Sequence, residues 1–410
     1  MSTSHEQLVE RLNRFPQRVP PSETLNKILA MLFSEREAEL VARLPIRPFK
    51  AAQAARLWDL DVKRAEAILQ SLAGRALIVD VEDDGESTYT VPPPMAGFLE
   101  FSMMRVRDDV DQQVLGELLY QYCNVEDAFV KDLFEDAGTP LGRVFVNEPV
   151  LQPTAHVLDY ERASHVVETA SYIGLGNCYC RFKMQQVDRA CDAPLDICLT
   201  FNGPAESLIK HDFARQIDVT EGLDVLQRAY ENNLVQIGEN AQEGVSFICN
   251  CCSCCCEALV AARRFEMLRP MTTTNFLPAV DADECVGCGA CADVCPMDAI
   301  AMVDNDAVID EEICLGCGLC VRACPTDSVT MEPREERVIT PINTTHRVVR
   351  HAIERGQLQN LIFDRQVLAS HRALANVLGA ILRMPPIERA LASEQVKSRY
   401  LKALIQRLGT

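Results

Sequence analysis

The sequence predicts a multi-domain protein of the α+β class. Near the N-terminus, helical apolar stripes are followed by a hairpin pattern, and further helical patterns occur in the middle of the chain and near its end. Between them lies a unit rich in cysteine and glycine that occurs twice. With 410 residues, of which 48% are hydrophobic and 24% charged, the chain is long enough for several globular cores. We expect four segments: residues 1–94, 95–275, 276–335 and 336–410.

The first segment, residues 1–94, has the pattern of a winged helix. An apolar stripe behind Ser22 predicts one helix, and Ser34-Glu-Arg-Glu37 is a capping box that opens a second. Two further helices are expected at residues 49–57 and 61–73. The apolar stripe consists of Leu25, Ile28, Leu29, Leu32 and Phe33. Behind these helices, two strand patterns at residues 76–81 and 87–91 flank an acidic turn and predict a hairpin.

The charge of this segment argues against DNA as its partner. A winged helix is shaped to place one helix in the major groove, and its wing contacts phosphate. Residues 21–92 contain nine Lys or Arg against twelve Asp or Glu, and the predicted wing tip carries Asp83, Asp84 and Glu86. We therefore do not expect nucleic acid as a partner. Winged helices also serve as protein-docking modules.

The second segment, residues 95–275, is expected to be a mostly helical metal-binding domain. Six cysteines within the eight residues 249–256 are too dense for core packing, which gives no reason to prefer sulfur over leucine. A first group of four cysteines suffices for one 4Fe-4S cluster, and the six of the second group can complete another or bridge between the two. The first group is Cys178, Cys180, Cys191 and Cys198, and the second is Cys249, Cys251, Cys252, Cys254, Cys255 and Cys256.

Other metal sites fit the same cysteines. A zinc or copper site uses equally soft ligands, and a non-cubane cluster uses adjacent cysteines. The side chains of Cys251 and Cys252 point in different directions, so we do not expect them to bind one metal in the same way. Arg181 is expected either to donate to a cluster sulfide, which offsets the cluster charge, or to be an ordinary surface arginine. Cys123 stands alone and is expected to pack in a core.

The third segment, residues 276–335, contains the repeated unit. Three close cysteines wrap one face of a 4Fe-4S cubane, and the fourth, before proline, binds the other cluster. The glycines of the unit allow backbone N–H groups to approach the sulfides. A zinc ribbon needs neither the third cysteine nor the Cys-Pro end. The two copies read Cys285-Val-Gly-Cys288-Gly-Ala-Cys291-Ala-Asp-Val-Cys295-Pro296 and Cys314-Leu-Gly-Cys317-Gly-Leu-Cys320-Val-Arg-Ala-Cys324-Pro325.

On these residues, the stretch 281–333 resembles the two-cluster bacterial ferredoxins, and the resemblance implies a βαββαβ-like module. Every ligand position of that pattern is filled. We expect two 4Fe-4S clusters here and at least one additional iron-sulfur cluster in the second segment. The crossing of the fourth cysteine assigns Cys285, Cys288, Cys291 and Cys324 to cluster I, and Cys314, Cys317, Cys320 and Cys295 to cluster II.

A weaker resemblance extends over nearly the whole chain. The winged-helix pattern, Cys178-Tyr-Cys180-Arg181, the run from Cys249 to Cys256 and the ferredoxin unit together resemble large ferredoxin-like 4Fe-4S binding proteins of anaerobic bacteria. The function of that group is poorly defined. The resemblance therefore implies iron-sulfur redox work without naming a substrate.

The fourth segment, residues 336–410, is expected to be helical and basic. Residues 341–410 hold eleven Lys or Arg against four acids, whereas residues 281–330 hold eleven acids against the single Arg322. A packed helix is expected at residues 371–382. We expect the basic helices to clamp the acidic ferredoxin face, and the linker 269–278 to hold Cys291 or Cys320 near the 249–256 run.

The composition also predicts where the protein works. The N-terminus lacks a basic region followed by an apolar run, and no stretch of 18 apolar residues occurs, so we expect a cytoplasmic protein without a membrane span. Nineteen clustered cysteines inside a cell indicate metal rather than disulfides. We find no nucleotide-binding fingerprint.

These patterns predict an iron-sulfur electron-transfer protein that works with redox partner proteins. If the chain is an enzyme, we expect an iron-sulfur oxidoreductase component. Two alternatives stay open: a redox-sensing regulator that binds DNA through the winged helix, and a reductase with an active-site cluster at residues 249–256.

Overall fold

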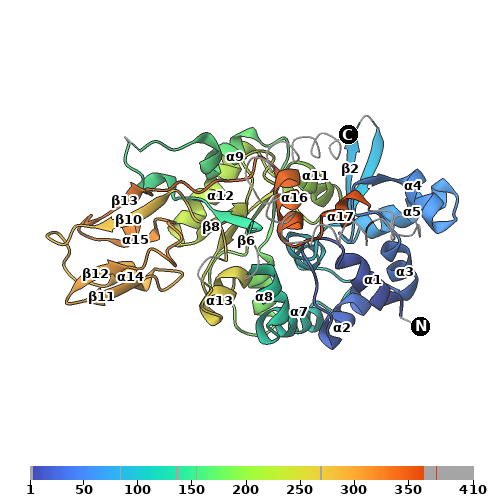
Figure 1. Ribbon diagram of the computed structural model, residues 1–410, viewed down its shortest axis with the longest axis horizontal. Helices are drawn as coiled ribbons and strands as arrows, with labels where there is room; N and C mark the ends of the chain where they lie inside the picture. Colours follow the sequence, from blue (N-terminus) through green and yellow to red (C-terminus); the bar gives the residue numbers. More distant parts are fainter. Residues whose placement is uncertain are drawn as a thin grey trace.

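The computed structural model describes residues 3–83, 85–134, 138–153, 155–267, 270–363 and 375. It mixes helices and strands, in agreement with the predicted α+β class. Figure 1 shows an elongated molecule, with the N-terminal helices at one end, the twice-repeated cysteine unit at the other and a six-stranded sheet between them.

The N-terminal part consists of five helices and a three-stranded antiparallel sheet in the order β1-β3-β2. The hydroxyl of Ser22 caps α2, and Ser34 and Glu37 form the expected capping box of α3. The predicted helix at residues 49–57 begins instead with a short strand. The elements are α1 (Ser4–Leu12), α2 (Glu23–Leu32), α3 (Glu35–Ala42), β1 (Phe49–Lys50), α4 (Ala51–Trp58), α5 (Val62–Ala73), β2 (Val79–Asp83) and β3 (Glu86–Thr90). The winged-helix interpretation stays a prediction.

A six-stranded antiparallel sheet in the order β4-β8-β9-β6-β5-β7 forms the centre of the molecule. Its strands are β4 (Gly142–Val144), β5 (Ile173–Asn177), β6 (Asp196–Phe201), β7 (Arg215–Gln216), β8 (Val235–Glu239) and β9 (Phe247–Cys251). The α-helices around it are α6 (Leu99–Phe101), α7 (Gln112–Tyr120), α8 (Ala128–Phe134), α9 (Ala163–Thr169), α10 (Tyr179–Gln185), α11 (Asn202–Lys210), α12 (Val219–Glu231) and α13 (Glu257–Arg264). Short helical turns lie at Pro94–Phe98, Gln121–Val125, Glu148–Val150 and Asp159–Glu161.

This sheet corrects the expectation that residues 95–275 are mostly helical up to the metal region. Helices are numerous, but a hydrophobic core of this segment is built on the strands of the sheet and the helices that pack on them. The strands escaped prediction because they are short and because glycine and cysteine interrupt their β-branched residues. At Gly238 of β8 a Cβ atom would lie 2.6 Å from the ring of Phe145 and 2.8 Å from the carbonyl oxygen of Phe247, so close packing requires glycine.

The N-terminal part is attached to the central sheet through Asp80. Its carboxylate is buried on β2 and accepts hydrogen bonds from Ser207 Oγ (2.8 Å) and Lys210 Nζ (2.7 Å), and His211 Nε2 lies 3.0 Å away. These partners hold the pKa of Asp80 well below its ordinary value although burial opposes them. Lys210 and His211 are thus engaged in fixing α11 to β2.

The repeated cysteine unit forms a small two-sheet module with the element order strand, helix, strand, strand, helix, strand. β10 (Phe276–Val280) pairs with β13 (Val329–Pro333), and β11 (Ile300–Val303) pairs with β12 (Asp306–Ile309), both antiparallel. The helices α14 (Ala290–Asp293) and α15 (Leu319–Ala323) each start after a glycine with positive φ.

The described part of the basic C-terminal segment does not clamp the acidic module, which corrects that expectation. Its helices α16 (Thr344–Glu354) and α17 (Leu358–Ile362) lie beside the sheet and the N-terminal helices (Figure 1). Arg347 pairs with the buried Glu239 at 3.1 Å and Arg355 with the half-buried Asp132 at 2.6 Å, so this helix is bound by acids of the central domain. The predicted helix at 371–382 lies outside the described residues, apart from Ala375.

Among the described residues, no helix has the length and apolar character that crossing a membrane requires.

Candidate metal centres

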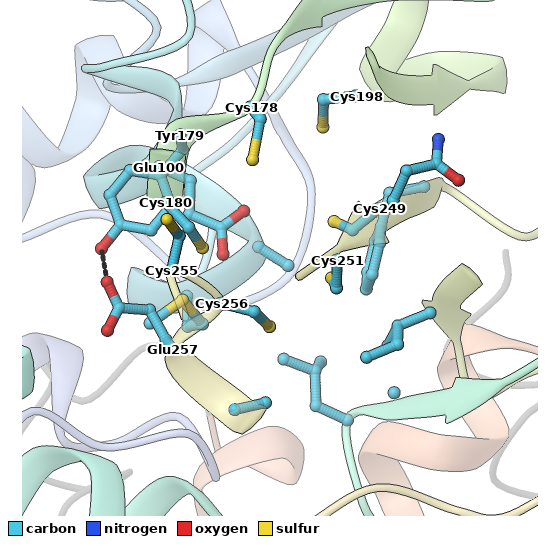
Figure 2. A pocket seen from close by; sticks show the side chains of 18 of the residues that line it. Glu100, Cys178, Tyr179, Cys180, Cys198, Cys249, Cys251, Cys255, Cys256 and Glu257 are labelled. Carbon is cyan, nitrogen blue, oxygen red and sulfur yellow. Dashed lines mark hydrogen bonds between the residues drawn. The ribbon is translucent and has the colours of Figure 1, made fainter. Parts of the chain in front are cut away.

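Eight of the ten upstream cysteines line one cavity beside strands β6 and β9 of the six-stranded sheet (Figure 2), and six of the eight have no part in the second cysteine group described below. The cavity has an open volume of about 780 Å³ and an otherwise mainly apolar lining. Cys249 and Cys251 stand two residues apart on β9, so both side chains point to the same face of the strand. These six are Cys178, Cys180, Cys198, Cys249, Cys251 and Cys256, whereas Cys252 and Cys255 line the cavity and also belong to the second group.

The local structure explains how the other four reach this cavity. Cys198 lies on β6, opposite Gly176 of β5. Cys178 is the N-cap residue of α10 and Cys180 lies in its first turn, while Cys256 is the N-cap residue of α13. A helix N-terminus favours negative charge, so these helix starts suit thiolates.

Contacts among the six sulfur atoms favour thiolates at two positions. Hydrogen bonds from the thiols of Cys198 and Cys251 lower the pKa of Cys249 to about 5. Hydrogen bonds from Cys180 and Cys251, assisted by backbone N–H groups of α13, lower the pKa of Cys256 as well. Anionic sulfur is the form that binds metal.

A buried ion pair lies directly behind the cavity. The ammonium of Lys183 and the carboxylate of Glu257 are fully enclosed and bonded to each other, and Asn124 donates to the same carboxylate at 2.9 Å. Tyr179 OH donates to Glu257 at 3.2 Å, as Figure 2 shows. The attraction of Glu257 raises the pKa of Lys183 despite burial, which keeps a cation close to Cys180.

Glu100 brings a carboxyl group into the cysteine-lined cavity (Figure 2). Burial raises the pKa of this group well above its ordinary value, and the charge of Cys249 adds to the effect.

A second, larger cavity of about 1830 Å³ open volume adjoins the first. It lies between the N-terminal part, the central sheet and α16, and its lining is mainly apolar. The two cavities share the lining residues Ala96, Glu100, Met104, Leu141, Cys198, Phe247 and Cys249. An organic molecule in the larger cavity would therefore reach two of the six cysteines.

The remaining four upstream cysteines form a separate group. The sulfur atoms of Cys191, Cys252, Cys254 and Cys255 all lie within 4.8 Å of one another. Arg181 is fully buried beside them and donates to the sulfur atoms of Cys191 and Cys252, at 3.4 Å each. The surface-arginine interpretation of Arg181 is thus wrong.

The structure divides the cysteines differently from their order in the chain. The sequence groups placed Cys191 with Cys178, Cys180 and Cys198, whereas the fold brings Cys191 to the turn at 252–255. The pairing of β6 with β9 explains why the spatial groups differ from the sequence groups, because it places Cys198 beside Cys249. Cys251 and Cys252 both line the cavity, but only Cys252 belongs to the group of four close sulfur atoms. Cys123 is buried in the core, as expected for packing.

In the repeated module, the cysteines gather as two sets. Cys285, Cys288, Cys291 and Cys324 line one small cavity of about 290 Å³ open volume. Cys295 lies close enough to Cys314, Cys317 and Cys320 for its charge to raise the pKa of each of these three thiols, although burial is the larger cause. The last cysteine of each copy thus lies with the first three of the other.

The second copy of the repeat packs against the body of the protein. At Gly318 a Cβ atom would lie 2.7 Å from Val150, and the backbone N–H of Asn147 donates to the carbonyl oxygen of Cys317 at 3.1 Å. Cys314, Leu315 and Leu319 belong to the same continuous core as Cys251 and Cys256. The residue expected in this place was Cys291 or Cys320, and both belong to a separate core cluster within the module.

Residues 284–328 match the family model described as a 4Fe-4S dicluster domain. No curated protein and no solved structure matches the chain. Together with the cysteine groups, the match supports an iron-sulfur protein with a ferredoxin-like iron-sulfur module in this stretch.

Proposed function

We propose that the chain is an electron-transfer protein that passes electrons between two 4Fe-4S clusters in the module and a further iron-sulfur cluster in the six-cysteine cavity. Bound iron-sulfur clusters supply one-electron redox chemistry. The observation that carries the proposal is the continuous hydrophobic core to which Cys314 of the module and Cys251 and Cys256 of the cavity all belong.

The two sets of module cysteines serve as ligands in this proposal. Cys285, Cys288, Cys291 and Cys324 hold cluster I, a choice supported by the cavity that these four residues share. Cys295, Cys314, Cys317 and Cys320 hold cluster II, which therefore lies on the side of the module that faces the body.

The six cysteines of the upstream cavity provide more thiolates than one cubane needs. Lys183 offsets part of their negative charge from a fully buried position. The mainly apolar lining keeps water away from the sulfur atoms, and this helps to set a reduction potential.

The far end of the module is suited to receive a redox partner. Val286, Val303 and Val308 are exposed there, with relative accessibilities of 64%, 50% and 50%. Cys288 of the cluster I set is exposed among them. All eleven acids of residues 281–330 are exposed as well, so a partner with a basic rim around an apolar patch fits this surface.

Iron and sulfide analysis of anaerobically purified protein tests the proposal. We expect about twelve irons per chain, from three clusters of four. A measured count of about eight irons would refute the upstream cluster. A protein without iron would refute the proposal as a whole.

A second candidate function is a reductase that acts at the six-cysteine cavity, and the adjoining large cavity favours it. A disulfide substrate would take up two electrons, delivered by the module, and two protons, giving two thiols. Glu100 and Cys249 line both cavities and would meet such a substrate. Spectral change of the reduced protein on addition of small disulfides would support this function, and unchanged spectra would count against it.

The DNA-binding regulator stays an untested alternative. A salt-sensitive shift of a DNA probe by the full-length protein would favour it.

A further inference from the structure

We infer that Cys191, Cys252, Cys254 and Cys255 bind a single zinc ion, separate from the iron-sulfur clusters. The inference is independent of the proposed electron transfer, because a closed tetrathiolate zinc site is structural and has no redox chemistry. Three observations carry it: the spacing of the sulfur atoms, the buried charge of Arg181, and the two chain segments that the four cysteines join.

The sulfur atoms stand at the spacing of a tetrahedron around one ion. Zinc–sulfur bonds of about 2.3 Å give sulfur–sulfur edges of about 3.8 Å in a regular tetrahedron. The separations are 3.6 Å between Cys191 and Cys252, 3.7 Å between Cys254 and Cys255, and 3.9 Å between Cys255 and Cys191. A disulfide would require about 2.05 Å. A cubane binds each thiolate at a different iron corner, with the sulfur atoms pointing away from its centre, and so needs them farther apart.

Arg181 requires negative charge at this place. Its guanidinium is fully buried, and its hydrogen bonds go to the sulfur atoms of Cys191 and Cys252 and to the carbonyl oxygen of Pro194. No carboxylate of the described residues pairs with it, so neutral thiols would leave a buried cation without a counter-charge. Zn²⁺ with four thiolates carries a charge of −2, which Arg181 reduces to −1. Arginine donating to ligand sulfur is the outer-shell arrangement expected around such an ion.

The ion would join two connections that adjoin the paired strands β6 and β9. Cys191 lies in the loop between α10 and β6, and the other three cysteines lie in the turn between β9 and α13. These two connections flank Cys178, Cys180, Cys198, Cys249, Cys251 and Cys256. Zinc therefore cross-links the frame that holds the six-cysteine cavity open.

Metal analysis and zinc-edge X-ray absorption of the anaerobically purified chain test the inference. We expect about one zinc per chain with four sulfur neighbours at about 2.3 Å. Cys254 is the exposed member of the four, so Cys254→Ser disturbs the fold least; it should lose the zinc or reduce the shell to three sulfur atoms. Cys249→Ser is the matched control, which should keep the zinc while altering the upstream iron. A chain with no zinc, or a four-sulfur zinc shell that persists in Cys254→Ser, would overturn the inference.

Arg181 offers a second test that leaves all four ligands in place. Arg181→Met should lower the zinc affinity about 10- to 100-fold, as measured by competition with a chelator, and Arg181→Lys should restore part of it. Unchanged zinc affinity in Arg181→Met would overturn the role of the buried charge. Because zinc and iron are counted separately, a missing upstream cluster with zinc present refutes only the proposed function, and the reverse result refutes only the zinc site.

Discussion

Replacing Gly316 by alanine should weaken the module at the face that holds the cluster II cysteines. Gly316 has φ +71°, and its Cβ would lie 2.2 Å from both the carbonyl oxygen of Phe276 and Thr274 Oγ1. Neither atom can move easily. The Phe276 oxygen belongs to a backbone strand, and Thr274 Oγ1 donates to the Gly316 oxygen at 2.8 Å in a buried position.

Gly289 provides a control that separates the two costs of the substitution. It has φ +77°, yet its Cβ would meet no atom within 4 Å. Alanine at either position costs about 1–2 kcal/mol for the left-handed backbone. At Gly316 the overlap adds about 1–3 kcal/mol for displaced packing. We therefore expect a loss of about 2–5 kcal/mol for Gly316→Ala and about 1–2 kcal/mol for Gly289→Ala.

Anaerobic urea titration, followed by the visible absorbance of the iron-sulfur clusters, measures this difference. The midpoint for Gly316→Ala should fall clearly below that for Gly289→Ala, and Gly316→Ala should lose iron first. Equal midpoints for the two variants would refute the close packing of the second repeat against Thr274 and Phe276.

Three further predictions concern the central domain. Asp80→Ala leaves the hydrogen-bond donors of α11 without their acceptor and should lower the free energy of unfolding by about 2–3 kcal/mol in urea titration, whereas Ser87→Ala on the neighbouring strand should change it by less than about 0.5 kcal/mol. Because the pKa of Asp80 is lowered in the folded protein, its contribution is complete above about pH 4 and is lost as the pH falls further, so the stabilities of parent and Asp80→Ala should converge in acid. Glu257→Gln leaves the Lys183 charge buried without its counter-ion and should cost about 3–5 kcal/mol; if Lys183→Met/Glu257→Gln recovers none of this loss, the ion-pair explanation fails.

The sequence predicted best those features that are set by residues close together in the chain. Ser22 and Ser34 define helix starts through contacts within three residues, and both caps are present where expected. The Cys-x-x-Cys-x-x-Cys units are likewise recognised from a cysteine spacing that spans only a few residues.

The remaining features depend on contacts between distant residues. Cys191 joins the 252–255 turn across about 60 residues of sequence, because β6 and β9 pair in the central sheet. The packing of α16 follows from the buried Glu239 and the half-buried Asp132, two acids that no local pattern identifies as its partners. Burial also distinguishes Arg181 from a surface arginine, and burial is a property of the whole fold.

The rate at which the upstream centre is reduced tests the electron-transfer account most directly. In Cys314→Ser, whose loss of cluster II is checked by electron paramagnetic resonance, the spectrum of the six-cysteine centre should stay intact while its reduction through the module slows at least about tenfold. Cys123→Ser, which alters a packing cysteine away from the module, should keep the parent rate. Equal reduction rates in Cys314→Ser and the parent would contradict the proposal that the module delivers these electrons.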